Sequence, residues 1–181
     1  MRLDKLLVNL KYGSRKMIQH DIRKGNVTVN KEIIKKGDYK VDPTVDEIVY
    51  FDEEIYYKES VLLMMNKPSG YISANRDNLH KTVLELIEEP YNRFDLKIAG
   101  RLDIDTEGLM LLTNDGTLLH QIISPNKDVY KKYFVRVKNK FDPKKLEEEY
   151  EIKDGRDYLY KPSTPFIEEI NDTEFYLSIK E

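Results

Sequence analysis

The chain has 181 residues, of which 40% are hydrophobic and 35% are charged, and its formal net charge is -3. This length allows one ordinary domain or a small module followed by a medium-sized domain, and either arrangement can bury a core. The absence of cysteine excludes a disulfide framework and a thiolate metal site, and the three scattered histidines, His20, His80 and His120, lack metal-ligand spacing. We therefore expect no metal.

The sequence predicts no contact with a membrane. It contains no run of 18 apolar residues that could span a bilayer. Its N-terminus, MRLDKLLVNLKYGSRK, also lacks the continuous apolar core of a signal peptide. We expect a cytoplasmic protein, and we expect it to be a monomer.

Positive charge is concentrated at the N-terminal end. Residues 1–40 hold 11 Lys and Arg against 4 Asp and Glu, a net of +7, so residues 41–181 hold 19 against 29, a net of -10. A compact basic segment is typical of a polyanion contact, because each phosphate that a Lys or Arg neutralises releases condensed counterions. An ordinary solvated surface is the alternative explanation of this charge.

The first part of the chain predicts two short helices followed by short strands. Leucines recur at helical spacing over residues 3–10, and Gly13-Ser14 then supplies a stop and an N-cap for a second amphipathic helix that ends at Lys24-Gly25. Strands are predicted at residues 27–29, 33–34, 39–41 and 48–51, with a turn at Asn30-Lys31. The acidic stretch 42–59 then changes the composition sharply. We place a domain boundary there, with domains at residues 1–56 and 57–181.

The second part predicts strands interrupted by turns and short helices. The apolar run 61–65 predicts a buried strand whose two methionines fill the core. The further elements expected are strands at 71–74, 109–113 and 130–138, helices at 82–87, 118–123 and 142–150, and a hairpin over 166–180 that turns at Asn171-Asp172.

Residues 100–116, GRLDIDTEGLMLLTNDG, place the acidic residue Asp103 two positions after Arg101, in front of a polar turn and an apolar strand. A calcium-binding loop would use Asp103, Asp105, Glu107 and Gly108, but it would need a bidentate glutamate where Asn114 stands, so we reject it. The carboxylates could instead cap backbone donors at turns. The interpretation that we favour makes Asp103 a nucleophile, with Arg101 pointing the same way along a strand-like stretch.

The GRLD run closely resembles the signature of the RsuA-like family, the pseudouridine synthases of small-subunit rRNA. The NKPSG run at residues 66–70 and the KxYxVxV pattern at residues 131–137 resemble motifs of the same family. Residues 1–50 resemble the αL-type RNA-binding module that is shared with ribosomal protein S4. The resemblance implies an α+β fold, in which this small module precedes a mixed, mainly antiparallel sheet catalytic domain with flanking helices.

The resemblance also implies roles for individual residues. Asp103 would be the catalytic nucleophile, Arg101 would occupy the space near the extruded base, and Tyr133 would stack on the target uracil. Basic residues of the N-terminal module would face ribosomal RNA or a pre-ribosomal particle: Arg2, Lys5, Arg15, Lys16, Arg23, Lys24 and Lys31. His120, on a predicted helix, is an alternative general base.

The chemistry of pseudouridine formation explains why a carboxylate would suffice. The bond between ribose carbon 1′ and base nitrogen 1 breaks, the base rotates, and carbon 5 joins the ribose, so no cofactor and no net redox change is needed. In the mechanisms proposed for the family, the aspartate adds to the ribose or to the base, or takes a proton from ribose carbon 2′. In each of them Asp103 must be ionised.

The chain departs from the family pattern at its end. Relatives continue with a Gly-Arg/Lys-x-His-Gln-Val-Arg/Lys-Arg run and a further small subdomain that supplies a cation to the catalytic aspartate. We therefore expect a short chain or a fragment. A non-catalytic rRNA-binding or ribosome-assembly module is the main alternative function, and a metal-assisted hydrolase using Asp103 with Asp105 is a third.

Overall fold

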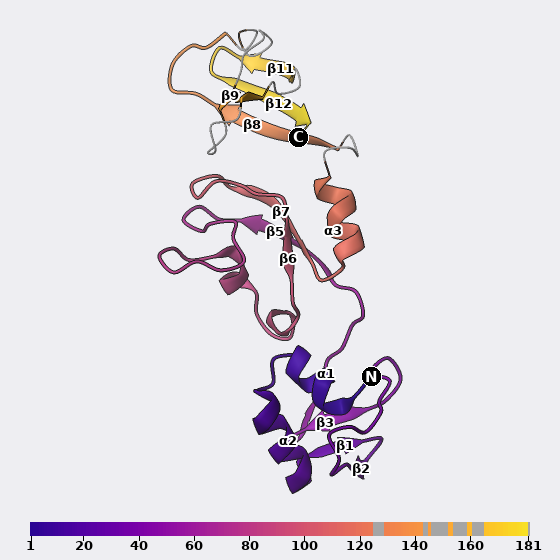
Figure 1. The fold of residues 1–181 in the computed structure, drawn as a ribbon. Helices are drawn as coiled ribbons and strands as arrows, with labels where there is room; N and C mark the ends of the chain where they lie inside the picture. The colour runs from indigo at the N-terminus through magenta and orange to yellow at the C-terminus, as the bar shows by residue number, and fades with distance from the viewer. Residues whose placement is uncertain (125–128, 143–144, 146–151, 154–158, 161–164, 181) are drawn as a thin grey trace. The chain divides into compact units, whose positions relative to one another are not determined.

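The computed structural model describes residues 1–124, 129–142, 145, 152–153, 159–160 and 165–180 (Figure 1). The chain divides into two compact units, Met1–Leu119 and His120–Glu181. Within the described residues, no helix combines the length and the apolar character needed to cross a bilayer. The same residues contain no group of three or more His, Asp or Glu side chains placed to hold a metal ion.

The N-terminal part of the first unit has two helices packed beside an antiparallel sheet (Figure 1). The helices are α1 (Leu3–Asn9) and α2 (Arg15–Lys24), and the strands are β1 (Val27–Val29), β2 (Glu32–Ile33), β3 (Ile48–Tyr50) and β4 (Glu53–Glu54), in the order β2-β1-β3-β4. Its core is made of side chains that are almost fully buried: Leu3, Leu6, Leu7, Ile18, Ile22 and Val27. The helical spacing of these leucines and isoleucines puts them on the buried faces of the two helices.

The predicted ends of helix α2 are confirmed. The Ser14 hydroxyl accepts a hydrogen bond from the Met17 backbone N–H at 3.3 Å, which satisfies one free donor of the first turn. Gly25 ends the helix in the left-handed conformation, at φ 84°. The two-residue turn between β1 and β2 is also confirmed, with Asn30 and Lys31 both at positive φ.

The rest of the first unit has a three-stranded antiparallel sheet. Its strands are β5 (Leu62–Lys67), β6 (Lys97–Ala99) and β7 (Gly108–Thr113), in the order β5-β7-β6. The short 3-10 helices η1 (Val83–Leu86) and η2 (Tyr91–Arg93) lie between β5 and β6 in the sequence, and helix α3 (Gly116–Ile123) follows β7. The predicted helix at 82–87 is therefore a single 3-10 turn, which a capping box of Thr82 and Glu85 begins.

Strand β5 corrects the expectation of a strand buried on both faces. Met64 is 78% exposed, whereas its neighbour Met65 is half-buried. Successive side chains of a strand point to opposite faces, and here one face of β5 carries Met64 outward while the other packs on the core. Only Met65 of the two methionines therefore contributes to the core within this unit.

Two predicted strands do not form. Residues 39–41 contribute only an isolated bridge between Lys40 and Arg2, and residues 71–74 contribute only one between Ile72 and Thr82. Neither segment lies along a neighbouring strand for more than one residue, so neither builds a ladder of hydrogen bonds.

The second unit contains another three-stranded antiparallel sheet. Its strands are β8 (Tyr130–Arg136), β11 (Phe166–Asn171) and β12 (Glu174–Lys180), in the order β11-β12-β8, and a separate pair joins β9 (Ile152–Lys153) to β10 (Leu159–Tyr160). The predicted hairpin is confirmed by the pairing of β11 with β12, but Asn171 pairs with Glu174, so the turn lies at Asp172-Thr173, one residue later than predicted. The helix predicted at 142–150 lies largely outside the described residues.

Candidate active site and RNA-binding face

Asp103 lies in the loop that joins β6 to β7. Its side chain and that of Arg101 are both exposed, and among the described residues neither takes part in a hydrogen bond or an ion pair. The loop begins at Gly100 and ends at Gly108, with φ angles of 97° and 138° that favour glycine. Residues 101–103 belong to no strand. The strand alternation that predicts a common direction for Arg101 and Asp103 therefore does not apply.

A buried lysine holds the part of this loop that follows Asp103. Lys67, at the end of β5, is fully buried, and its Nζ donates to the carbonyl oxygens of Ile104 at 3.2 Å, Thr106 at 2.7 Å and Pro68 at 3.1 Å. An ammonium group has three donors, so each finds a carbonyl acceptor without a carboxylate. The backbone N–H of Gly70 also donates to the Ile104 carbonyl, at 2.8 Å.

A serine holds the part of the loop that precedes Asp103. The Ser73 hydroxyl donates to the Leu102 carbonyl oxygen at 2.6 Å and accepts from the Leu102 backbone N–H at 3.0 Å. The backbone is thus fixed on both sides of Asp103 while its carboxylate keeps its oxygens unused. An exposed carboxylate on a restrained loop can act as a nucleophile or as a base.

The other candidate residues of this region differ from Asp103 in their surroundings. Asp115 caps helix α3, because its carboxylate accepts from the backbone N–H groups of Thr117 at 2.8 Å and Leu118 at 3.0 Å. The side-chain oxygen of Asn114 accepts from the Val61 N–H at 2.7 Å, which agrees with the rejection of a calcium loop. His120 lies exposed on α3.

Tyr133 lies in the middle of β8, opposite Leu177 of β12, and its side chain is half-buried. Val135 shares its face of the strand, while Phe134 and Lys132 occupy the exposed face. Tyr133 therefore belongs to the second compact unit, whereas Asp103 belongs to the first.

The predicted RNA-contacting residues divide into paired and unpaired cations. Lys5, Lys16, Lys24 and Lys31 are exposed and make no ion pair within the described residues. Arg2 instead donates two hydrogen bonds to Asp4, at 2.9 and 2.8 Å. These bonds hold the pKa of the buried Asp4 carboxylate at about 2. Arg15 is 68% exposed, with one nitrogen 3.9 Å from the same carboxylate, and Arg23 donates to the Gln19 carbonyl.

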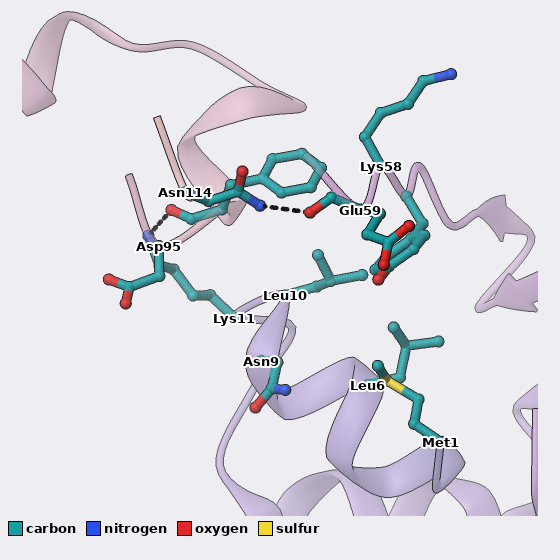
Figure 2. Close-up of a pocket in the computed structure, with 11 residues that line it drawn as sticks. Met1, Leu6, Asn9, Leu10, Lys11, Lys58, Glu59, Asp95 and Asn114 are labelled. Carbon is teal, nitrogen blue, oxygen red and sulfur yellow. Dashed lines mark hydrogen bonds between the residues drawn. The ribbon is translucent and has the colours of Figure 1, made fainter. Parts of the chain in front are cut away.

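A cavity of about 530 Å³ lies elsewhere in the first unit, beside helix α1 (Figure 2). Lys11 and Asp95 line it, together with the linker residues Lys58 and Glu59 and with Asn114, whose amide donates to the Glu59 carbonyl. None of its lining residues belongs to the loop 100–107. The cavity is therefore separate from Asp103.

Lys67 and Ser73 are the residues of this site that sequence reasoning missed. Lys67 ends the apolar run LLMMNK directly before a proline, and a charged residue at the end of a buried strand was a detectable signal. Ser73 offered none, since it stood in the predicted strand at residues 71–74, where a single serine is ordinary.

Comparison with known proteins decides the family. Residues 61–175 match the family model described as RNA pseudouridylate synthase, and residues 1–47 match the S4 domain model. The chain belongs to the RNA pseudouridylate synthase family. Its enzyme class is therefore that of the pseudouridine synthases, which are isomerases, and its N-terminal module is an S4 domain, as predicted.

Individual relatives agree with this assignment. An uncharacterized RNA pseudouridine synthase of Bacillus subtilis (strain 168) is 41% identical over 186 residues, covering 100% of this chain and 77% of that protein. Ribosomal small subunit pseudouridine synthase A is 38% identical in Yersinia pestis, over 77% of this chain and 59% of that protein. In Escherichia coli (strain K12) it is again 38% identical, over 77% and 60%. The chain thus spans about three fifths to three quarters of the length of these relatives.

A crystal structure of a pseudouridylate synthase supports the fold. It has a TM-score of 0.59 and 30% sequence identity, and the match covers 100% of this chain and 77% of the other. The predicted α+β class, with mainly antiparallel sheets, is confirmed by this neighbour and by the antiparallel pairing of the described strands.

Proposed function

We propose that this protein isomerises a specific uridine of small-subunit ribosomal RNA to pseudouridine, with Asp103 as the nucleophile. The observation that carries the proposal is the exposed Asp103 carboxylate on a loop whose backbone is held on both sides, in a chain of this family. The choice of small-subunit rRNA is supported by the names of the Yersinia and Escherichia relatives.

The site would act on a nucleotide that has left its stack. Extrusion of the target uridine costs roughly a few kcal/mol, which protein contacts must offset. Arg101 would occupy the space near the extruded base, and Tyr133 would offer its ring for stacking on the uracil. Breakage of the bond from carbon 1′ to nitrogen 1 is followed by bonding of carbon 5 to carbon 1′. The hydrogen of carbon 5 is lost and a proton is gained at nitrogen 1, so the atoms balance without a cofactor.

The S4 domain would supply the sequence-independent part of RNA binding. Exposed lysines without an ion-pair partner among the described residues, such as Lys16 and Lys24, can neutralise phosphates at little cost. Arg2 is the weakest candidate, because binding a phosphate would compete with its hydrogen bonds to Asp4. We further infer that residues 1–56 form the RNA-binding domain and residues 57–181 the catalytic domain of a monomer that acts in the cytoplasm on rRNA or a pre-ribosomal particle.

Replacement of the carboxylate tests the proposal. We expect Asp103→Asn to lower the rate of pseudouridine formation in transcribed small-subunit rRNA by at least about 100-fold, because the amide cannot act as nucleophile or base. Carbodiimide modification followed by primer extension would measure the product, and the Kd for rRNA should stay within about twofold. Asp105→Asn, an exposed carboxylate of the same loop, is the matched control and should remain active. An Asp103→Asn variant as active as the wild type would refute the proposal.

The rival function is a module that binds rRNA without modifying it. The exposed basic residues of helix α2 favour this function as much as they favour the enzyme. It predicts strongly salt-dependent rRNA binding and no pseudouridine from the wild-type chain at any concentration. The wild-type arm of the same primer-extension experiment therefore distinguishes the two.

A further inference from the structure

Ser73 binds both backbone polar groups of the residue that directly precedes Asp103. Its hydroxyl donates to the Leu102 carbonyl at 2.6 Å and accepts from the Leu102 N–H at 3.0 Å, across 29 residues of sequence. We propose that Ser73 is a positioning residue for Asp103, whose hydroxyl sets the place of the Asp103 carboxylate by fixing the backbone at Leu102. This inference rests on the proposed role of Asp103 as nucleophile.

The two hydrogen bonds restrain two different peptide planes. The N–H of Leu102 belongs to the peptide shared with Arg101, and its carbonyl belongs to the peptide shared with Asp103. Because each peptide unit is planar, holding both planes fixes the two backbone dihedral angles of Leu102. The second plane carries the Asp103 Cα atom directly, so a rotation there would move the carboxylate.

The loop needs this restraint because its entrance is unpacked. Gly100 has a φ of 97°, and apart from its neighbours Ala99 and Arg101 no residue has a heavy atom within 4 Å of the position that a Cβ would take there. For Arg101 and Leu102, the hydrogen bonds found in the described part of the chain come from Ser73 alone. Lys67 and Gly70 hold only the part of the loop that follows Asp103. Without the Ser73 hydroxyl, the backbone of Arg101 and Leu102 could rotate about Gly100 and move Asp103.

The Leu102 side chain supplies the second point of attachment. It is half-buried against the hydrophobic core, and its Cδ1 atom lies 4.0 Å from the position that a Cβ on Gly108 would take. Packing therefore limits translation of Leu102, and the Ser73 hydroxyl limits its rotation. Together they hold the residue before the nucleophile in one conformation, which is the preorganisation that a catalytic group needs.

Two substitutions at one position test the inference. We expect Ser73→Ala to lower kcat for rRNA by about 10–100-fold, since a misplacement of 1 Å can cost about 100-fold in rate. The KM should stay within about twofold and the Tm should be nearly unchanged. We expect Ser73→Thr to recover most of the rate, because it keeps the hydroxyl. Ser69→Ala is the matched control, an exposed serine of the same segment with no side-chain hydrogen bond among the described residues.

Hydrogen exchange gives a readout that does not need activity. The Leu102 amide should exchange at least about 10-fold faster in Ser73→Ala than in the wild type, and Ser73→Thr should restore its protection. The inference is overturned if Ser73→Ala keeps the wild-type kcat, if alanine and threonine are equally slow, or if kcat falls only together with the Tm.

Failure of this inference can be told apart from failure of the proposed function. If Asp103→Asn is inactive while Ser73→Ala is fully active, the positioning role alone is wrong. If Asp103→Asn is active, or the wild type forms no pseudouridine, the proposed function is wrong and the positioning role falls with it. In that case a Ser73-dependent protection of Leu102 would show a loop clamp that serves no catalysis.

Discussion

Lys67 shows how a single buried charge can be satisfied by backbone alone. Its ammonium group donates to three carbonyl oxygens, and two of them, on Ile104 and Thr106, belong to the loop of Asp103. Removal of the ammonium group would leave the Pro68 and Thr106 carbonyls without this donor, while the Ile104 carbonyl would keep its bond from the Gly70 N–H. The cost of an unsatisfied buried polar group is about 1–3 kcal/mol, and more where a charge was involved.

We therefore predict that Lys67→Met lowers the free energy of unfolding by about 2–4 kcal/mol. Urea denaturation followed by circular dichroism would measure the loss. Lys97→Met is the control, since Lys97 lies on strand β6 of the same sheet with its side chain 44% exposed and, among the described residues, pairs only with the exposed Asp95, and it should cost less than about 1 kcal/mol. Equal stability of the two variants would show that the three carbonyls do not depend on Lys67.

The residues of the candidate site differ in how far the sequence predicts them. Asp103 and Arg101 stand in one short run of letters, so a motif identifies them as candidates. Ser73 and Lys67 act on that run from 29 to 39 residues away, through hydrogen bonds to its backbone. Backbone acceptors are present in every residue and carry no mark in the sequence, so these contacts had to come from the structure.

At the scale of elements, the end of helix α1 is tied to the segment around η2. Lys11 donates from Nζ to the carbonyl oxygens of Asn92 at 2.7 Å and Phe94 at 2.9 Å, and the second bond is drawn in Figure 2. The guanidinium carbon of Arg93 lies 3.9 Å from the centre of the Tyr12 ring, a cation–π contact. Partial burial of its ammonium group lowers the pKa of Lys11.

We predict that Lys11→Met lowers the free energy of unfolding by about 1–2 kcal/mol, because the methionine keeps the chain length but loses both hydrogen bonds. Faster hydrogen exchange over residues 91–94 should accompany the loss. Lys5→Met, in helix α1, is the control, since the Lys5 side chain is exposed and has no partner among the described residues. Unchanged exchange in Lys11→Met would mean that the segment is held by its aromatic contacts alone.

Elements were predictable where their signal was local. The cap and stop of α2 and the turn at Asn30-Lys31 follow from residue types whose conformations are restricted. The strands expected at 39–41 and 71–74 failed because a strand also needs a partner alongside, which composition does not show. The burial predicted for Met64 was wrong for a related reason, since an apolar run does not tell whether a sheet is covered on one face or on two.

At the scale of the whole molecule, the charge asymmetry follows the boundary between the two family matches. The net charge of +7 over residues 1–40 falls within the S4 match, which covers residues 1–47. The acidic remainder includes the match to the synthase family over residues 61–175. Positive charge, which attracts RNA, is therefore concentrated in the S4 domain. The proposed chemistry lies in the part that matches the synthase family.

The stability of that module should depend on pH at both ends of the scale. Asp4 has its pKa lowered from 3.8 to about 2, chiefly by its hydrogen bonds with Arg2. A lowered carboxylate pKa stabilises the fold above pH 4, and this stability is lost as the pH falls from about 4 to about 2. Burial and the Asp21 carboxylate raise the pKa of Tyr50 from 10.0 to about 12. Stability from the neutral phenol is therefore present below pH 10 and lost between about 10 and about 12.

We predict that Asp4→Asn removes roughly 1–2 kcal/mol of stability at pH 7, discounted because Arg2 is 39% exposed. It should also flatten the fall in Tm between pH 4 and pH 2, since the group that titrates there is gone. Tyr50→Phe should flatten the alkaline fall in the same way and leave the acid side unchanged. Asp52→Asn is the control, because Asp52 is exposed and forms no hydrogen bond among the described residues. Melting curves from pH 2 to pH 12 would be measured for the wild type and the three variants. If the Tm of Asp4→Asn still falls between pH 4 and pH 2 as steeply as that of the wild type, another group titrates there.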